Sequence, residues 1–207
     1  MKRFTLIELM VVIAITALLA GLLLPVLARG RTAARIARAH GELRGITVAL
    51  ILYRTDFLSL PPTRASCNTR AIYELPLELI GYLPRGSLND TVIARVPDVF
   101  HPELGGYKYR APGPAIFNEY TFQADGGTLW VPDGFPGTEA ETGQYYTSQA
   151  ASPVRYAVWS WGPDPDSPKL ANSGRAPIPQ QYWLRNSGDT GVIVHYEDRD
   201  GQVHASP

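Results

Sequence analysis

The chain has 207 residues, with 19 acidic and 19 basic side chains and 18 prolines. A net charge of zero gives no long-range attraction to nucleic acid, and the single cysteine, Cys67, excludes an internal disulfide. Once the apolar N-terminal segment is set aside, about one modest domain remains.

Residues 4–28 form the first predicted element, an apolar helix with one carboxylate, Glu8, near its start. At helical rise the span is about 37 Å long, enough to cross a bilayer core of roughly 30 Å. An ionisable group in such a span is costly, so Glu8 is expected to have a function and a partner. The uninterrupted length, Glu8 and the lack of an Ala-x-Ala site disfavour a cleaved secretory signal. An ordinary single-pass anchor remains the alternative.

The same helix is predicted to continue through residues 29–60 as an amphipathic half. Its apolar residues follow one another at alternating spacings of three and four, which indicates one stripe lying against a soluble domain. The stripe comprises Ile36, Ala39, Leu43, Ile46, Leu50, Tyr53 and Phe57. Pro61 and Pro62 are expected to end the helix. Pro25 removes a backbone hydrogen bond inside the apolar half and makes it a weak point.

Residues 61–207 are predicted to form a globular domain. A short second helix is expected from about 71 to 82, broken or started by Pro76. The stretch 111–152 is rich in Gly, Pro, Thr and Tyr and is interpreted as an insertion. One hairpin is expected within it, pairing residues 120–122 with 128–131.

Two firmer strands follow, at 154–159 and 192–197. Both are rich in β-branched and aromatic residues and have turn signals on either side. After the turn at 198–201, residues 202–204 can return as a short edge strand. The predicted fold is therefore α+β, with one long helix laid across a small antiparallel sheet.

The sequence contains no catalytic set that predicts an enzyme. It has no nucleophile motif and no P-loop. Its four histidines, His40, His101, His195 and His204, lack metal-ligand spacing. His195 is interpreted as a surface or half-buried residue, and His101 as a structural one.

The opening run Phe-Thr-Leu-Ile-Glu, residues 4–8, resembles the start of mature type IV pilins and type II secretion pseudopilins. A cut before Phe4 would make Glu8 the fifth residue and Pro25 the twenty-second, where the family carries its glutamate and a helix-loosening proline. The resemblance implies that residues 1–3 are a leader, that Phe4 is methylated, and that Glu8 of an arriving subunit meets the amino group of its neighbour's Phe4. Arg3 stands where the family has glycine. Cleavage here, a start further upstream and lack of processing therefore remain open.

The later motifs resemble those of the major, G-type pseudopilin. In order they are Asp98-Val99-Phe100, Tyr107-Lys108-Tyr109 and Ser160-Trp161-Gly162-Pro163-Asp164. Val99 replaces the proline that the family carries. This order favours a subunit of a type II secretion pseudopilus that drives protein export. A type IV pilin of a surface pilus, for adhesion, motility or DNA uptake, is the alternative, although such pilins commonly close a loop with a cysteine pair.

The loop from Ser160 to Ser167 resembles the calcium-binding turn of that pseudopilin. Asp164 fills the matching position, and Asp166 and Asp189 are the further candidate ligands. Calcium requires six to eight oxygens, mostly from carboxylates and carbonyls. A turn stiffened by Pro165, which replaces the family's glycine, is the alternative to a calcium site.

The resemblance implies a single-pass protein of the bacterial inner membrane with its C-terminal domain in the periplasm, assembled into a filament in the periplasm or at the cell surface. The implied partners are further copies of the chain, prepilin peptidase, an inner-membrane assembly platform, minor pseudopilins and membrane lipid. Nucleic acid is expected only for a surface pilus.

One observation opposes this interpretation. Counting flanking positive charge predicts the reverse orientation, because fewer basic residues precede the apolar span than follow it. They are Lys2 and Arg3 before it, and Arg29, Arg31, Arg35 and Arg38 after it. The resemblance is preferred because family members insert through a dedicated N-terminal signal.

A membrane-anchored enzyme or binding domain remains the other alternative, using the aromatic residues Tyr120, Trp130, Tyr145 and Tyr146.

Overall fold

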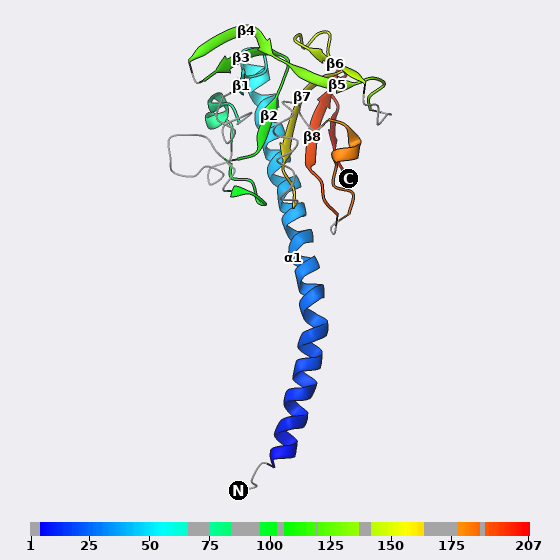
Figure 1. The fold of residues 1–207 in the computed structure, drawn as a ribbon. Coiled ribbons are helices and arrows are strands. Elements are labelled where there is room, and N and C mark those ends of the chain that lie inside the picture. The colour runs from blue at the N-terminus through cyan, green and yellow to red at the C-terminus, as the bar shows by residue number, and fades with distance from the viewer. Residues whose placement is uncertain are drawn as a thin grey trace.

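The computed structural model describes residues 5–65, 75–83, 96–102, 106–118, 120–136, 142–163, 178–186 and 189–207. One long helix, α1, lies with its C-terminal half against a head of β-strands, and its N-terminal half projects from the head as a rod (Figure 1). The predicted α+β arrangement, a half-packed helix on a small antiparallel sheet, is confirmed.

Helix α1 spans Leu6–Phe57 without a break, although Pro25 lies inside it. It ends at Leu58, whose backbone is left-handed with φ 56°. The predicted stripe is confirmed at its centre, where the side chains are buried against the head, and these are Ala39, Leu43, Ile46 and Leu50. Phe57 departs from the prediction because it is 58% exposed and its ring stacks on Tyr53 at 4.5 Å.

A four-stranded antiparallel sheet packs on this stripe, in the order β2-β7-β8-β9. Its strands are β2 (Lys108–Arg110), β7 (Val154–Ser160), β8 (Ile193–Asp198) and β9 (Val203–Ala205). The last three match the predicted strands to within one residue at each end. Helix α1 contacts β7 and β8 directly, so the middle of the sheet carries the main core.

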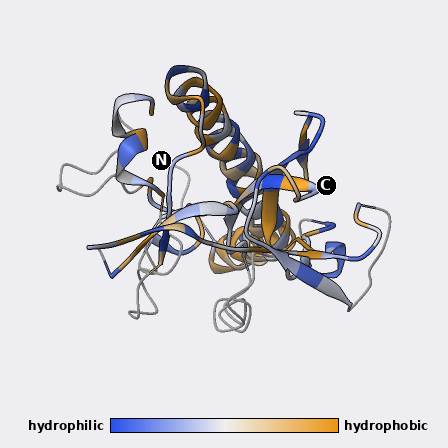
Figure 2. Ribbon diagram, turned by 90° about the horizontal axis from the view of Figure 1, so that it is seen from above, coloured by the Kyte–Doolittle hydropathy of each residue, from blue (hydrophilic) through white to orange (hydrophobic). Residues whose placement is uncertain are grey.

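The opposite face of this sheet is also covered, by a second apolar cluster. It contains Leu129, Val131, Val154, Ala157, Trp159, Trp161, Ile178, Trp183, Val192, Val194 and Tyr196. Strand β8 is therefore buried on both sides, with five of its six residues fully buried. In the view from above, hydrophobic residues lie along α1 and at the centre of the head, and hydrophilic residues lie toward the periphery (Figure 2).

The segment 111–152 forms two hairpins instead of one. Strand β3 (Gly113–Phe117) pairs with β4 (Thr121–Gly127), and β5 (Leu129–Pro132) pairs with β6 (Gly143–Tyr146). The predicted pairing of residues 120–122 with 128–131 is wrong because β4 folds back on the strand before it. Gly127 permits this close approach, since a Cβ there would lie 2.8 Å from the carbonyl oxygen of Ala111.

Three short elements complete the head. Strand β1 (Thr63–Ala65) runs parallel to β3, which places a parallel pair where only antiparallel pairing was predicted. The 3-10 helix η1 (Leu77–Gly81) begins directly after Pro76, so the proline starts this turn. It is shorter than the helix predicted for 71–82, of which residues 71–74 lie outside the described part. A second 3-10 turn, η3, covers Gln180–Tyr182.

Candidate assembly site

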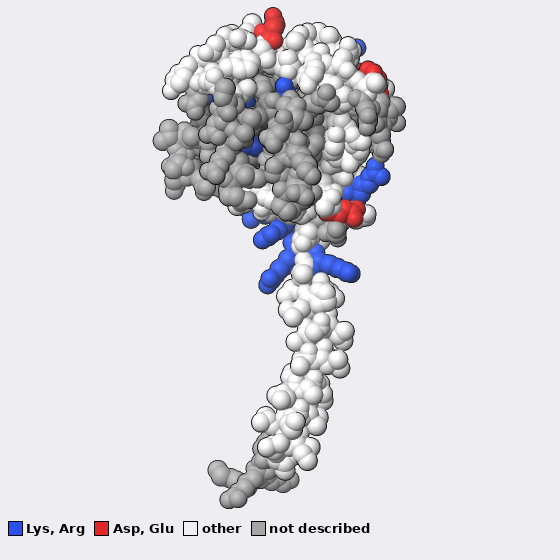
Figure 3. All heavy atoms as spheres, in the orientation of Figure 1, with Lys and Arg blue, Asp and Glu red and all other residues white. Residues whose placement is uncertain are grey.

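The apolar half of α1 contacts no other described part of the molecule. Its large side chains are 51–73% exposed. Among the described residues, α1 is the single helix long and apolar enough to cross a membrane, and none of its most apolar stretch is buried. On the face seen in Figure 3 the rod carries no charged side chain until it meets the basic side chains below the head. An exposed apolar surface of this size is typical of a segment that contacts lipid or another protein.

Glu8 lies in the first turn of this rod and forms a capping box with Thr5. The Thr5 backbone N–H donates to Oε2 of Glu8 at 2.8 Å, and the Thr5 hydroxyl donates to the same oxygen at 2.7 Å. In return the Glu8 N–H donates to Oγ1 of Thr5 at 3.3 Å. The Thr-x-x-Glu spacing of residues 5–8 is a recognised sequence signature of this motif, so the capping box was predictable from the sequence alone.

The capping box fixes where the acid lies without neutralising it. Among the described residues, no donor contacts the second carboxylate oxygen, Oε1 of Glu8. That oxygen can accept a cationic donor from another molecule. Arg3 and Phe4, the predicted processing and methylation residues, lie outside the described part of the chain. Their roles, and those of Glu8 and Pro25 in assembly, remain predictions.

A ring of arginines surrounds α1 where it leaves the head (Figure 3). It consists of Arg29, Arg31, Arg35 and Arg38, all exposed. Arg38 donates from Nε to Oε1 of Glu42 at 2.7 Å. The other three make no ion pair with a described residue. The ring marks the position along α1 at which an apolar environment must give way to water.

Two polar contacts between described residues fix α1 to strand β8. At one, Arg54 of α1 donates to Oε1 of Glu197, whose side chain is fully buried, and Arg155 of β7 donates to the same oxygen from Nη1 at 3.1 Å. At the other, Nδ1 of His40 lies 3.1 Å from Nε2 of His195. His195 is 2% exposed, so its interpretation as a surface or half-buried residue is wrong. It is buried because α1 covers the face of β8 that it occupies.

The histidine pair predicts a loss of stability in mild acid. Burial, followed by the nearby His40 ring and the Arg44 guanidinium, lowers the pKa of His195 from 6.5 to about 4. The unfolded chain therefore binds a proton that the folded chain does not, and stability falls as the pH falls through this window. From this ring alone we expect a loss of roughly 3 kcal/mol between pH 6.5 and 4. Denaturant unfolding of the detergent-solubilised protein at several pH values measures it.

The variant His195→Gln provides the comparison for that experiment. It keeps a polar group beside His40 but removes the titrating ring. Its free energy of unfolding is expected to change less over the same pH window than that of the wild type. Equal slopes for the two proteins would show that the buried ring does not cause the loss.

A buried aspartate, Asp98, joins two of the sequence motifs. Its Oδ1 accepts hydrogen bonds from the Phe100 N–H at 2.9 Å and the Ser160 hydroxyl at 2.8 Å, and its Oδ2 accepts from the Trp161 N–H at 2.9 Å. Asp98 is 1% exposed. Burial raises the pKa of its carboxyl, although the three donors act in the opposite direction. Sequence reasoning identified both motifs but not this contact between them.

The predicted calcium ligands lie only partly within the described residues. Asp189 is exposed, and its Oδ2 accepts a hydrogen bond from Nδ2 of Asn186 at 2.8 Å. Asp164 and Asp166 lie outside the described part. The described residues Gly162 and Gly191, two positions from Asp164 and Asp189 respectively, lie close together, because a Cβ on Gly162 would lie 1.9 Å from the carbonyl oxygen of Gly191. Among the described residues no group of three potential metal ligands forms. The calcium site remains a prediction.

Of the four aromatic residues proposed for a binding domain, Trp130, Tyr145 and Tyr146 lie on the β5–β6 hairpin, where Trp130 pairs with Tyr145, and Tyr120 lies apart from them. Trp130 is buried, and Tyr146 packs partly buried against the second core cluster. Tyr120 and Tyr145 are exposed, on the two different hairpins. The structure therefore divides this set between core and surface.

Comparison with known proteins gives two curated matches of the same name. Type II secretion system core protein G of Pseudomonas aeruginosa is 32% identical over 124 residues, which cover 59% of this chain and 83% of the relative. Type II secretion system core protein G of Pectobacterium carotovorum is 30% identical over 144 residues, covering 70% of this chain and 84% of the relative. No family model matches the sequence, and no solved structure matches it.

Proposed function

The chain belongs to the family of type II secretion system core protein G, the major pseudopilin, and on this premise we propose that it is a structural, non-enzymatic subunit of a type II secretion pseudopilus. Copies assemble through their N-terminal helices into a helical filament that drives protein export. The observation that carries this proposal is the exposed apolar rod of α1 with a single carboxylate, Glu8, in its first turn.

In this proposal, the packing of the apolar helices and the charge of Glu8 together set the register in which copies assemble. Helical packing of identical rods uses two different surfaces per contact, so the contact propagates as a filament instead of closing. An unpaired carboxylate inside the resulting apolar bundle costs several kcal/mol, and pairing offsets that cost. In the proposal, Glu8 meets the amino group of Phe4 on its neighbour. The two residues are four positions apart, which sets an axial offset of about 6 Å between these copies.

The proposed location is the bacterial inner membrane, with the head in the periplasm and the arginine ring at the membrane boundary. Prepilin peptidase would remove residues 1–3 and so create the amine on Phe4. The inner-membrane assembly platform and minor pseudopilins are the proposed further partners. The names of the two curated relatives support this secretion role over a surface pilus.

Intact-mass measurement of the native membrane protein tests the processing step. We expect the mass of a chain that begins at Phe4 and carries one added methyl group. Cleavage after Arg3 is what produces an amine four positions before Glu8. A mass that still includes Met1, Lys2 and Arg3 in assembled material would contradict the pairing.

A further inference from the structure

Two exposed surfaces lie at opposite ends of the head. One is the β3–β4 hairpin, at the end of the head farthest from the rod (Figure 1). Among the described strands, β4 is an edge strand that pairs only with β3, and its residues from Thr121 to Asp125 are exposed on both faces. Tyr120 is 88% exposed and Phe122 is 63% exposed. Phe122 lies opposite Ile116 in the pair, so the hairpin presents an apolar face.

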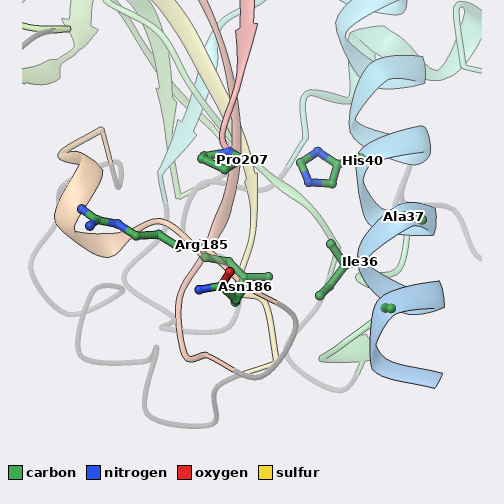
Figure 4. A pocket seen from close by; sticks show the side chains of 8 residues that line it. Ile36, Ala37, His40, Arg185, Asn186 and Pro207 are labelled. Atoms are coloured by element: carbon green, nitrogen blue, oxygen red, sulfur yellow. The ribbon is translucent and has the colours of Figure 1, made fainter. Parts of the chain in front are cut away.

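The second surface is a groove of about 330 Å³ at the other end of the head, beside the turns where α1 emerges (Figure 4). The helix contributes one face at helical spacing, and the chain near the C-terminus contributes the opposite wall. The lining residues are Ala33, Ile36, Ala37, His40, Leu184, Arg185, Asn186 and Pro207. Small residues of α1 leave the space that a bulkier side chain could fill.

The charges at the two surfaces are opposite in sign. Arg29 lies one turn below Ala33 on the same face of α1, is exposed, and makes no ion pair with a described residue. Arg185 lies in the wall of the groove. The hairpin carries the exposed Asp125. An aromatic, acidic hairpin therefore faces one way along the axis, and an apolar groove with a basic rim faces the other.

We propose that the β3–β4 hairpin of one copy docks in the groove of a second copy farther along the filament, with Tyr120 and Phe122 against the small residues of α1 and Asp125 toward Arg29. This inference rests on the proposed filament function. Residues 36–57 of α1 run the length of the head, about 30 Å at helical rise. The contact therefore joins copies offset by about a head length, a different pair from the one that Glu8 joins.

Cysteine crosslinking in assembled filaments tests the contact. In a Cys67→Ser background, Tyr120→Cys is combined with Ala33→Cys, and isolated filaments are treated with a mild oxidant. Each copy would then link through its hairpin to one neighbour and through its groove to another. We expect a ladder of covalent oligomers on denaturing gels, because the hairpin and groove contacts repeat along the filament.

The controls separate this inference from the proposed function. Either cysteine alone gives no ladder, and Tyr120→Cys paired with Gln202→Cys, an exposed site in the turn before β9, gives none either. Normal filaments of the Tyr120→Cys, Ala33→Cys protein without a ladder would overturn the docking proposal alone. A failure of the parent Cys67→Ser protein, and of the wild type, to form filaments would overturn the proposed function first.

A pair of substitutions gives a second measurement. Tyr120→Ser with Phe122→Ser removes both exposed rings from the hairpin. We expect the protein concentration needed for assembly to rise about tenfold or more, since truncating aromatic anchors at a contact commonly has effects of this size. Tyr145→Ser, which removes a half-exposed ring from β6, is the matched control and is expected to assemble as the wild type does. Equal assembly by the double variant and the wild type would contradict the proposal.

Discussion

Replacing Glu8 with alanine is expected to abolish filament formation while leaving a folded monomer in the membrane. The head lies far along α1 from Glu8 and makes no contact with it, so the core of the head is unaffected. The substitution leaves the amine of the neighbouring copy without a partner in an apolar bundle. A loss of about 3 kcal/mol per contact corresponds to roughly a hundredfold weaker association at every step. Sedimentation of membrane extracts and negative-stain electron microscopy measure the assembled fraction.

Two further variants separate the charge of Glu8 from its role in the capping box. Glu8→Gln can still receive the hydrogen bonds of Thr5, because glutamine also serves at this position of a capping box. It lacks the negative charge, and we expect it to fail in assembly as alanine does. Thr5→Ala removes the cap but keeps the acid, so a smaller defect is expected. Filaments of normal yield from Glu8→Gln would defeat the ion-pair proposal.

Replacing Asp98 with alanine is expected to have the largest effect on the stability of the head. The carboxylate satisfies two backbone N–H groups and one hydroxyl in a site that is almost fully buried. Each donor left unsatisfied costs about 1–3 kcal/mol, so a total loss of about 3 kcal/mol or more is expected. Denaturant unfolding of the purified protein in detergent, followed by circular dichroism, measures the change.

Two further aspartate variants serve as controls for Asp98→Ala. Asp98→Asn keeps one acceptor oxygen, for Phe100 and Ser160, and loses the acceptor that faces Trp161. It should destabilise by less than alanine does. Asp125→Ala removes an exposed aspartate from β4 and is expected to change the free energy of unfolding by no more than about 0.5 kcal/mol. If Asp98→Ala unfolds at the wild-type midpoint, the three hydrogen bonds do not stabilise the head as argued.

The main architecture could be predicted because its signals are local. The apolar run and the stripe that follows it both specify a helix, and α1 forms as one element across Pro25. Strands β7 and β8 follow from β-branched and aromatic runs between turns, and β9 follows from the turn at 198–201 that precedes it. Such patterns depend on neighbours in the sequence, and long elements with strong periodicity are the most reliable to assign.

The contacts that fix these elements to one another could not be predicted in the same way. His40 and His195 are separated by 155 positions, and Asp98 and Trp161 by 63. No periodicity links such residues. The prediction that residues 120–122 pair with 128–131 was wrong for a related reason. The exposed β4 has no buried face, so its sequence does not specify which strand it pairs with or in what register.

The continuity of α1 has a mechanical consequence. A helix of 52 residues is about 78 Å long, and it is fastened to the sheet at two heights, near residues 40 and 54, about 21 Å apart along its axis. Two contacts at different heights resist both translation of α1 along the sheet and rotation of α1 relative to it. A force applied along the helix axis at the N-terminal end of α1 is therefore transmitted to the far end of the head with little relative movement of helix and sheet.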